Sequence, residues 1–317
     1  MGTVTALFIG LGSIGTRHLK NLHAICEKQG LTLCAHALRS DLNRPLRPGV
    51  AELLAAQFTT LEDQAALPRY DMAFITNPTS LHAAALELVR GRAGALFIEK
   101  PIFSAEETGR TLSDLLPAGQ KAYVAAPMRW CGAMLALKKH LPQLRPYCAR
   151  VICSSYLPDW RPGVDYRTVY SAHKAMGGGV TIDLIHEWDY LVELFGKPEK
   201  LCNLRGQYSE LEIDSDDVSL YIARYPHLLV EVHLDYFGRG YRRSIELFCP
   251  TGSAVADFGA GTLTLPDGTV EDCREDVNER YIREMEYFLH YAMEGEGDSL
   301  NTPATALDVL KLTLGEL

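Results

Sequence analysis

The sequence lacks the features that mark several large classes of protein. Its eight cysteines include no CxxC pair and no zinc-ligand spacing, which disfavours a zinc site and leaves reduced thiols as the expected state. It contains no apolar run of about 18 residues, so no membrane-spanning helix is predicted. Because 40 acidic residues outnumber 31 basic ones, the charge balance disfavours nucleic acid and anionic membranes as partners.

What the sequence does contain is typical of a globular protein. With 47% hydrophobic and 22% charged residues, neither disorder nor a disulfide-stapled miniprotein is expected, and 317 residues suffice for two domains. The first residues, MGTVTALFIGLG, show no basic region, long apolar stretch or cleavage site. No signal peptide is therefore predicted, and a cytoplasmic location is expected.

Residues 1–122 predict strands that alternate with helices. Short apolar runs, which are typical of buried strands, occur at 4–9, 31–38, 72–75 and 96–98. A helix is expected at about 80–90, between the third and fourth of these runs. Strands separated by helices predict a doubly wound parallel sheet with helices on both faces, so an α/β domain is expected here.

Residues 123–317 follow a different pattern, in which polar and apolar residues alternate between turn residues. The strands are expected at 150–157, 219–225, 228–237 and 243–248. They predict an α+β domain with a large open, mainly antiparallel sheet. A helix at about 281–291 is expected to cover one face of this sheet, and a last helix at about 303–316 to pack back on the first domain.

The first motif with chemical content is Gly10-Leu11-Gly12-Ser13-Ile14-Gly15. It directly follows the first predicted strand and opens a predicted helix. Glycine permits a tight turn and a close approach of the backbone to a pyrophosphate, while the helix N-terminus supplies N–H groups and partial positive charge. In this context the motif predicts a dinucleotide-binding Rossmann domain. The alternative is a plain glycine turn between strand and helix.

The end of the second predicted strand bears on the choice of coenzyme. Where an NAD-binding unit usually has Asp or Glu to hold the ribose 2′-hydroxyl, this chain has Arg39 and Ser40 before Asp41. Pairing of Arg39 with a 2′-phosphate would favour NADP over NAD. If Arg39 is instead a solvated loop charge, Asp41 would bind the ribose of NAD.

Two further motifs stand at the ends of predicted parallel strands. They are Thr76-Asn77-Pro78 and Glu99-Lys100-Pro101. Ligands of open α/β sheets bind outside the carboxyl ends of the strands, so these residues are expected in the same crevice as the glycine turn. Lys100 is therefore expected to lie beside a cofactor.

Glycines 177–179 precede a predicted helix rich in acids. At about 100° per residue, Asp183, His186 and Tyr190 fall on one arc of this helix, and a separate apolar arc packs inward. The polar arc is expected to face a cleft, where a histidine can accept a proton near neutral pH. The alternative is a satisfied helix histidine with solvated acids. Two possible ligands do not make a zinc site, so no metal is predicted.

These motifs, together with His82 after the Thr76-Asn77-Pro78 turn, resemble the Gfo/Idh/MocA oxidoreductases over about residues 3–314. The resemblance implies an NAD(P)-dependent enzyme that oxidises or reduces a carbinol carbon of a sugar, cyclitol or nucleotide sugar. It also implies a homodimer or homotetramer formed through the sheet of the second domain.

The resemblance further implies roles for single residues. Lys100 would contact the reacting oxygen and the nicotinamide ribose, and His186 would be the acid/base, oriented by Asp183. Much of the family spaces this acid and histidine four apart, whereas here they are three apart. Cofactor contacts are expected from Gly10, Gly12, Ser13, Ile14, Gly15, Arg39, Ser40, Thr76, Asn77, Pro78, His82, Glu99 and Lys100.

Substrate contacts are expected from an aromatic and basic loop at 156–167. Rings cover sugar faces and arginine binds phosphate, which suits a polyhydroxylated or phosphorylated ligand. The alternative is a loop that closes over the sheet or meets a second subunit. The loop and the stretch GSIGTRH also resemble a family branch associated with bacterial surface-sugar pathways. With Arg129 and Trp130, which the resemblance adds, the expected substrate residues are Arg129, Trp130, Trp160, Arg161, Asp165, Tyr166, Arg167 and Tyr190.

Two other functions are compatible with the sequence. The resemblance extends to non-enzymatic members, so the chain could be a dinucleotide-responsive binding or regulatory protein. It could also be a reductase of an unrelated small carbonyl or imine that uses the same dinucleotide-binding domain. The presence of Lys100, Asp183 and His186 together favours the dehydrogenase, while the substrate, direction of reaction and subunit count stay open.

Overall fold

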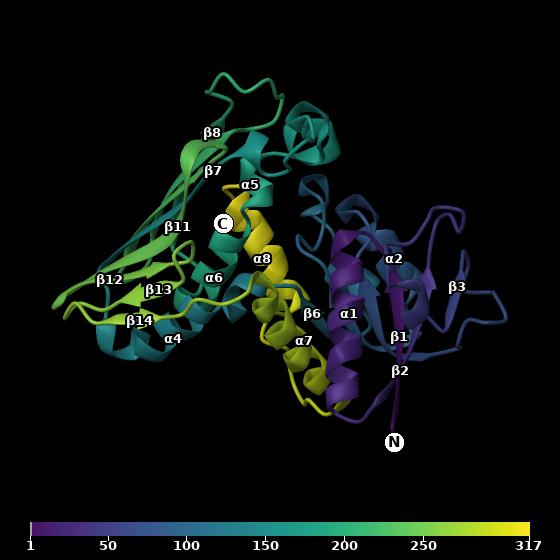
Figure 1. Ribbon diagram of the computed structural model, residues 1–317. Helices are drawn as coiled ribbons and strands as arrows, with labels where there is room; N and C mark the ends of the chain where they lie inside the picture. The colour runs from purple at the N-terminus through teal and green to yellow at the C-terminus, as the bar shows by residue number, and fades with distance from the viewer. Residues whose placement is uncertain (1) are drawn as a thin grey trace. The chain divides into compact units, whose positions relative to one another are not determined.

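The computed structural model describes residues 2–317, which fold into two compact units (Figure 1). The first unit contains the chain up to Ala125 together with Tyr281–Leu307, and the second contains Ala126–Arg280 and Asp308–Leu317. The chain thus leaves the first unit close to the expected boundary at 122/123. Its return to that unit begins at Tyr281, earlier than the last helix, at which the sequence predicts it.

The first unit is built on a six-stranded sheet with the order β3-β2-β1-β4-β5-β6. Every pairing in it is parallel. Its strands are β1 (Thr3–Ile9), β2 (Thr32–Leu38), β3 (Ala56–Phe58), β4 (Tyr70–Ile75), β5 (Ala93–Ile98) and β6 (Lys121–Val124). The ends of β1, β4 and β5 are almost continuously buried, as expected for a sheet covered on both faces. This confirms the predicted doubly wound α/β fold.

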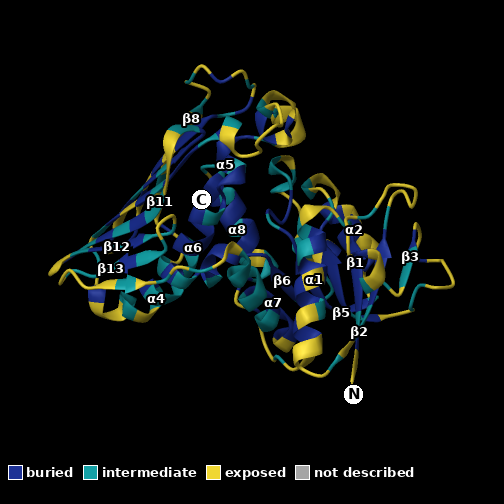
Figure 2. Cartoon of the chain, viewed as in Figure 1, coloured by how far each residue is buried: buried dark blue, intermediate teal, exposed yellow. Residues whose placement is uncertain are grey.

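The helices of this unit follow the strands that they connect. They are α1 (Ser13–Lys28), α2 (His82–Leu88), α3 (Leu112–Leu115), most of α7 (Val277–Met293), and the 3-10 turns η1 (Ala51–Leu53), η2 (Thr79–Leu81) and η3 (Ala105–Glu107). Figure 2 shows the sheet strands buried and the outer surface of α1 exposed. This is the amphipathic pattern that the helical spacing of Ile14, His18 and Leu22 predicts.

Helix α7 belongs with the parallel sheet, so the prediction that a helix at 281–291 covers the antiparallel sheet is wrong. Its Phe288 ring packs edge-on against Phe74 at 5.5 Å and against Phe97 at 5.1 Å between ring centroids. Tyr123 donates a 2.9 Å hydrogen bond to Glu284 of the same helix. The aromatic cluster of the first unit provides the apolar surface that this helix needs.

The second unit is built on an eight-stranded sheet with the order β14-β13-β12-β11-β7-β10-β9-β8. Only β10 and β7 pair in parallel, so the predicted mainly antiparallel sheet is confirmed. Its strands are β7 (Cys148–Tyr156), β8 (Lys200–Gly206), β9 (Val218–Arg224), β10 (Leu229–Asp235), β11 (Phe237–Cys249), β12 (Gly252–Asp257), β13 (Thr262–Thr264) and β14 (Val270–Asp272).

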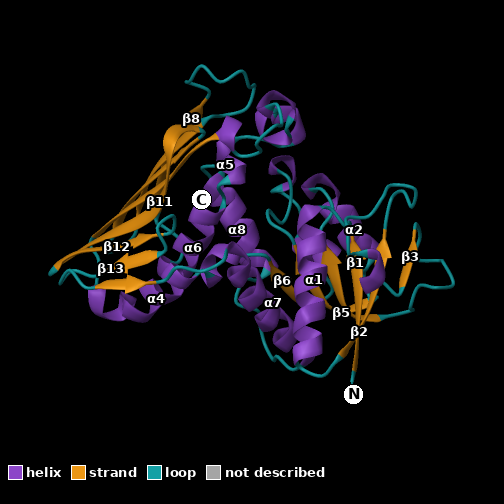
Figure 3. Cartoon of the chain, viewed as in Figure 1, coloured by secondary structure: helices purple, strands orange, loops and turns teal. Residues whose placement is uncertain are grey.

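Helices cover one face of this sheet (Figure 3). Helix α4 packs on β12 and β13, and α5 packs on β9 and β10. The helices and 3-10 turns are α4 (Gly132–Leu144), α5 (Val180–Asp183), α6 (His186–Phe195), α8 (Pro303–Thr313), η4 (Pro127–Trp130), η5 (Leu157–Asp159), η6 (Tyr166–Thr168), η7 (Tyr170–Ala172) and η8 (Lys174–Met176). Helix α8 is shared, since the division between the units falls at Leu307/Asp308.

The opposite face of the sheet carries exposed apolar side chains. Leu220 and Ile222 on β9 are 40% and 49% exposed, and Leu204, which pairs with Leu220 across the β8–β9 register, is 70% exposed. We refer to Leu204, Leu220, Ile222 and Leu229 as the open-face patch. Among residues 2–317, no helix has the length and apolar content that crossing a bilayer requires.

Candidate active site

The turn after β1 needs glycine at two positions for its own packing. Gly10 has φ +90°, and a Cβ there would lie 2.8 Å from the Cα and N atoms of Asn77. A Cβ on Gly15 would lie 2.4 Å from the Gly10 carbonyl oxygen. These two glycines let the start of α1 and the end of β4 approach the turn closely.

Gly12 is different, because nothing in the protein requires a glycine there. It is the N-cap of α1, with φ −69° and ψ −160°, and a Cβ would meet no atom within 4 Å. It is exposed, no side chain caps the helix, and the first turn carries no acid. An open helix N-terminus without a Cβ is the environment that a pyrophosphate needs, so these residues fit a dinucleotide. Ser13 is exposed beside Gly12, and Ile14 is half-buried.

Arg39 follows β2 directly and is partly exposed. Its guanidinium donates to the Gln57 side chain at 2.8 Å and to the Arg44 carbonyl oxygen. Both acceptors are neutral, and Arg39 forms no ion pair in the described residues 2–317. Ser40 and Asp41, the neighbouring candidates for ribose contacts, are exposed.

The Thr76-Asn77-Pro78 turn closes against the glycine turn. Thr76 is buried and donates to the carbonyl oxygens of Ile9 and Gly10 at 3.2 and 2.5 Å. His82 is 1% exposed, and its ring nitrogens lie 3.1 Å from the carbonyl oxygens of Asn77 and Ile102. Burial lowers the pKa of His82 below its ordinary value, despite these carbonyl partners. His82 therefore joins the turns after β4 and β5, and Pro78 is exposed beside it.

The Glu99-Lys100-Pro101 turn follows β5 and includes a cis Lys100–Pro101 peptide bond. Glu99 is 8% exposed, its Oε1 lies 2.6 Å from His18 Nε2, and its Oε2 accepts the Lys100 backbone N–H at 3.1 Å. Burial alone would raise the pKa of Glu99, but the hydrogen bond and charge of His18 outweigh it and hold that pKa below its ordinary value. Glu99 thus links α1 to the backbone of Lys100.

His18 was not predicted as a site residue, although its helical spacing with Ile14 and Leu22 marks it as buried. Its partner is 81 positions away in sequence, which no local pattern reports. Because β1, β4 and β5 are adjacent parallel strands, the glycine, Thr76 and Lys100 turns gather at one edge of the sheet.

In the second unit, the predicted helix after the triple glycine is interrupted. Helix α5 ends at Asp183 and α6 begins at His186, with Leu184 and Ile185 between them. The predicted single polar arc is therefore not formed: His186 is half-buried, but Tyr190 is 0% exposed and packs against the Phe258 ring at 5.5 Å.

Asp183 contacts hydroxyl groups instead of the neighbouring imidazole. Its Oδ1 accepts the Tyr170 hydroxyl at 2.5 Å, and its Oδ2 accepts those of Ser171 and Tyr236, both at 2.6 Å. Among residues 2–317 these three donors are its hydrogen-bond partners. We call the four residues together the Asp183 hub. The predicted orienting contact from Asp183 to His186 is thus not present in this structure.

Two of the three glycines before α5 are required by packing within the chain. A Cβ on Gly178 would lie 2.1 Å from the Tyr170 carbonyl oxygen, and one on Gly179 would lie 2.3 Å from Asp216 Oδ1. Only Gly177, with φ +79°, faces open space. Gly178 and Gly179 therefore bring the backbone close to residues 170–171 and to the side chain of Asp216.

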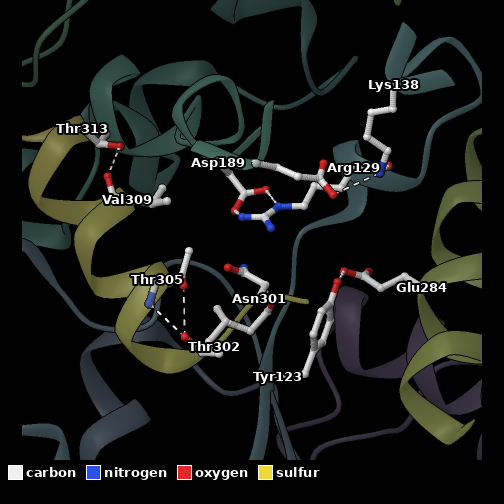
Figure 4. A network of polar contacts seen from close by, with 12 residues as sticks. Tyr123, Arg129, Lys138, Asp189, Glu284, Asn301, Thr302, Thr305, Val309 and Thr313 are labelled. Carbon is white, nitrogen blue, oxygen red and sulfur yellow. Dashed lines mark hydrogen bonds and ion pairs between the residues drawn. The ribbon is translucent and has the colours of Figure 1, made fainter. Parts of the chain in front are cut away.

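Two buried ion pairs hold α6. Glu187, which is 0% exposed, accepts from Arg243 at 2.7 and 3.2 Å. Asp189 accepts two hydrogen bonds from Arg129 at 2.9 and 2.7 Å, as Figure 4 shows. Arg129, a predicted substrate contact, is 3% exposed in this pair, and its neighbour Trp130 is half-buried.

In the predicted substrate loop, some side chains are held by ion pairs or hydrogen bonds and others are exposed. Arg167 pairs with both Asp165 and Glu212 at 2.9 Å, and the Tyr166 hydroxyl accepts the Glu212 backbone N–H at 3.2 Å. Arg161 is exposed and forms no ion pair among residues 2–317. Trp160 is 38% exposed, with its indole N–H donated to Ser155 at 3.0 Å.

No group of three or more His, Cys, Asp or Glu side chains in the described part of the chain is arranged to hold a metal ion. The first unit offers an open helix N-terminus at the sheet edge where the Lys100 turn also lies. The second offers a half-buried histidine on a firmly held helix.

Comparison with known proteins completes the description of the site. Residues 4–125 match a family model described as "Oxidoreductase family, NAD-binding Rossmann fold", the Gfo/Idh/MocA model. The "Uncharacterized oxidoreductase YrbE" of Bacillus subtilis (strain 168) is 25% identical over 325 residues, covering 96% of this chain and 89% of that protein.

Two solved structures have the same fold. The UDP-N-acetylglucosamine 3-dehydrogenase GnnA of Acidithiobacillus ferrooxidans superposes with a TM-score of 0.74 at 19% identity, covering 99% of this chain and 96% of its own. A levoglucosan dehydrogenase in complex with NADH and levoglucosan superposes with a TM-score of 0.80 at 16% identity. The superposition covers 99% of this chain and 96% of the dehydrogenase.

Proposed function

We propose, from the premise that residues 4–125 belong to the Gfo/Idh/MocA oxidoreductases with their NAD-binding Rossmann fold, that this protein acts on a hydroxyl or keto carbon of a sugar, cyclitol or nucleotide sugar. The observation that carries the proposal is the gathering of the glycine turn and Lys100 at one edge of the parallel sheet. The two similar dehydrogenases that act on levoglucosan and on UDP-N-acetylglucosamine support the substrate class.

The roles of the side chains follow from the chemistry of a carbinol carbon. A bound NAD(P) supplies the hydride acceptor or donor. We propose that the Lys100 ammonium polarises the reacting oxygen and that His186 takes or returns the hydroxyl proton. The half-buried position of His186 on α6 leaves its ring partly accessible for this exchange. Gly12 and the first turn of α1 would hold the pyrophosphate through backbone N–H groups.

Turnover by two variants tests these roles. Lys100→Ala and His186→Ala should each lower kcat by about 10²-fold or more, with dinucleotide affinity nearly unchanged, because each removes a group that acts on the reacting oxygen. Wild type is first titrated with NADH and NADPH by fluorescence, then screened at 340 nm against sugars, inositols and nucleotide sugars. Lys139→Ala and His227→Ala, both at exposed positions, are the matched controls.

The outcomes separate the candidate functions. Unchanged turnover in both Lys100→Ala and His186→Ala would refute their assigned roles. Dinucleotide binding without turnover on any compound would favour the regulatory protein, and turnover only on a non-sugar carbonyl or imine would favour the unrelated reductase. Absence of dinucleotide binding would remove the basis of the whole proposal.

We also propose a preference for NADP over NAD that rests on Arg39. Its hydrogen-bond acceptors are neutral, so its full charge is available to a 2′-phosphate. Arg39→Gln should weaken NADPH binding about tenfold more than NADH binding, which corresponds to about 1.4 kcal/mol. The measurement is the ratio of the two Kd values, with Asp41→Asn as the control. If Asp41→Asn instead weakens the binding of NADH selectively, Asp41 contacts the ribose and the protein prefers NAD.

Self-association through the open-face patch is a further part of the proposal. Leu204, Leu220, Ile222 and Leu229 lie on the adjacent strands β8, β9 and β10 and are 40–70% exposed. Leu204 and Leu220 pair directly across β8 and β9, and exposed apolar side chains on a sheet face without covering helices are typical of an interface between protein chains. We propose that a second copy of this chain covers it in a homodimer or homotetramer.

A further inference from the structure

The hydrogen bonds of the Asp183 hub all run from hydroxyl groups to one carboxylate. An ionised carboxylate is an acceptor only, and three hydroxyl donors at 2.5–2.6 Å match that state. Burial, followed by the negative charge of Asp183, raises the pKa values of Tyr170 and Tyr236 above their ordinary value. Both phenols therefore keep their protons and act as donors to a buried anion.

The donors come from two different parts of the second unit. Tyr170 and Ser171 lie 13 and 12 residues before Asp183, in the segment 157–179 between β7 and α5. Tyr236 lies 53 residues after it, between β10 and β11. The carboxylate thus fastens the segment 157–179 to the sheet.

The same segment is held again near its start through Tyr236. The Trp160 ring packs edge-on against the Tyr236 ring at 5.2 Å, and its indole N–H is donated to Ser155. A single tyrosine therefore contacts both Asp183 and Trp160. Gly178, near the end of the segment, lies close to the carbonyl oxygen of Tyr170 in the middle of the segment.

The side chains that this arrangement leaves accessible suit a sugar ligand. Trp160 and Tyr170 are 38% and 41% exposed although their polar atoms are bound to the protein, so what they present is ring surface. Arg161 follows Trp160 directly in the chain and is exposed. Aromatic faces beside a guanidinium recognise sugars that carry an anionic group.

We propose that Asp183 is a positioning residue for substrate recognition, which holds the segment 157–179 in place through Tyr170, Ser171 and Tyr236. This proposal rests on the proposed dehydrogenase function and deepens it. Asp183 acts through the segment that presents Trp160, Arg161 and Tyr170, which its hydroxyl partners belong to or hold. Its loss affects substrate affinity, and the substrate class is a sugar with a phosphate or carboxylate group.

The decisive variant is the double substitution Tyr170→Phe with Ser171→Ala. It keeps Asp183 and the aromatic ring at position 170, and it removes only the two hydroxyls by which the segment reaches the hub. If Asp183 acts through the segment, this variant reproduces the effect of Asp183→Ala. If Asp183 acts through His186, it does not.

The matched control is Asp217→Ala. Asp217 is 0% exposed and likewise accepts short hydrogen bonds, from the backbone N–H groups of Tyr208 and Ser209 at 2.8 Å, and none of the side-chain hydrogen bonds described for it in residues 2–317 reaches the segment. Its loss measures the general cost of removing a buried carboxylate from the second unit.

Two measurements are made on the full chain. Hydrogen–deuterium exchange of residues 157–179 requires no substrate, so it tests the hub even if the proposed function fails. Steady-state kinetics over pH, with the substrate found in the screen, then separates KM from kcat. Dinucleotide titration in parallel reports whether the first unit is intact.

The expected result is faster exchange in 157–179 for both Asp183→Ala and the double variant, but not for Asp217→Ala. KM for an anionic sugar rises at least about tenfold, kcat stays within about threefold, and the pH profile of kcat keeps its wild-type midpoint. Unchanged exchange in the double variant would overturn the proposal. So would a shifted pH profile in Asp183→Ala that the double variant lacks, because Asp183 would then act on His186.

Discussion

The three glycines of the turn after β1 are needed for different reasons, and this difference can be measured residue by residue. Gly10 and Gly15 leave no room for a Cβ within the protein, since such an atom would lie 2.8 and 2.4 Å from backbone atoms. Gly12 has open space around it and backbone angles that any residue can adopt. The first two glycines serve the fold, whereas the space at Gly12 is open, as our proposal of a bound dinucleotide requires.

Alanine substitutions at Gly12 and Gly15 should therefore have opposite effects. Gly12→Ala is expected to leave Tm unchanged or slightly raised, because it restricts the unfolded chain, while weakening dinucleotide binding about tenfold or more. Gly15→Ala is expected to lower the free energy of unfolding by about 1–3 kcal/mol through overpacking. Thermal unfolding and fluorescence titration of both variants check this. A lower Tm of Gly12→Ala with unchanged dinucleotide affinity would contradict this prediction.

Among the elements, α6 combines a candidate acid/base with two buried ion pairs. Burial alone would lower the pKa of Arg243, but the Glu187 carboxylate raises it well above its ordinary value, so this pair stays charged. The two pairs fix the rotation and axial position of a helix of only ten residues. Such a helix is marginal on its own, and its stability comes from these tertiary contacts.

Replacing one partner of an ion pair on α6 should lower the free energy of unfolding more than replacing both partners. Glu187→Leu or Arg243→Met alone is expected to lower the free energy of unfolding by about 3–5 kcal/mol, because each leaves a buried charged group without its partner. The double variant Glu187→Leu with Arg243→Met is expected to recover most of that loss. Urea unfolding of the wild type, the single variants and the double variant gives the coupling energy. Additive losses would show that the two side chains do not stabilise each other.

For the whole molecule, the decisive features are two units assembled from discontinuous segments and an uncovered sheet face. The open-face patch lies on β8, β9 and β10 of the second unit, where the alternation of buried and exposed residues along β9 is regular. One side of the sheet packs against helices within the chain. The other is the surface that we assign to a second copy.

A single charge in the open-face patch should separate the copies. Ile222→Glu is expected to yield a species with the mass of one chain, since a carboxylate in an apolar interface is costly to bury. Leu88→Glu, a change at a comparably exposed leucine of the first unit, is the control and should keep the wild-type mass. Light scattering coupled to size-exclusion chromatography gives both masses. A wild type that is already monomeric, or an associated Ile222→Glu variant, would contradict the assignment of this face.

Much of the fold was predictable because its signals are local. The apolar runs of β1, β2, β4 and β5 and the three turn motifs are each contained within a few residues, and the match of residues 4–125 confirms the family resemblance that they indicate. The elements that were missed are strands β3, β6, β8 and β12 to β14 and helices α3 and α4. Several of them are only three or four residues long, and Lys138, Lys139 and Pro142 interrupt the apolar spacing of α4. The place of α7 was predicted wrongly because amphipathic spacing shows that a helix packs, but not on which sheet.

By itself, the sequence determined the doubly wound first unit, the mainly antiparallel second sheet and the glycine turn, because each depends on periodicity or on the absence of a Cβ. Only the tertiary structure decided what the buried polar groups contact. His18 meets Glu99 across 81 residues, and Asp183 meets Tyr236 across 53. A carboxylate is stabilised by whichever donors the packed chain brings within hydrogen-bond distance, and no spacing along the sequence records that choice.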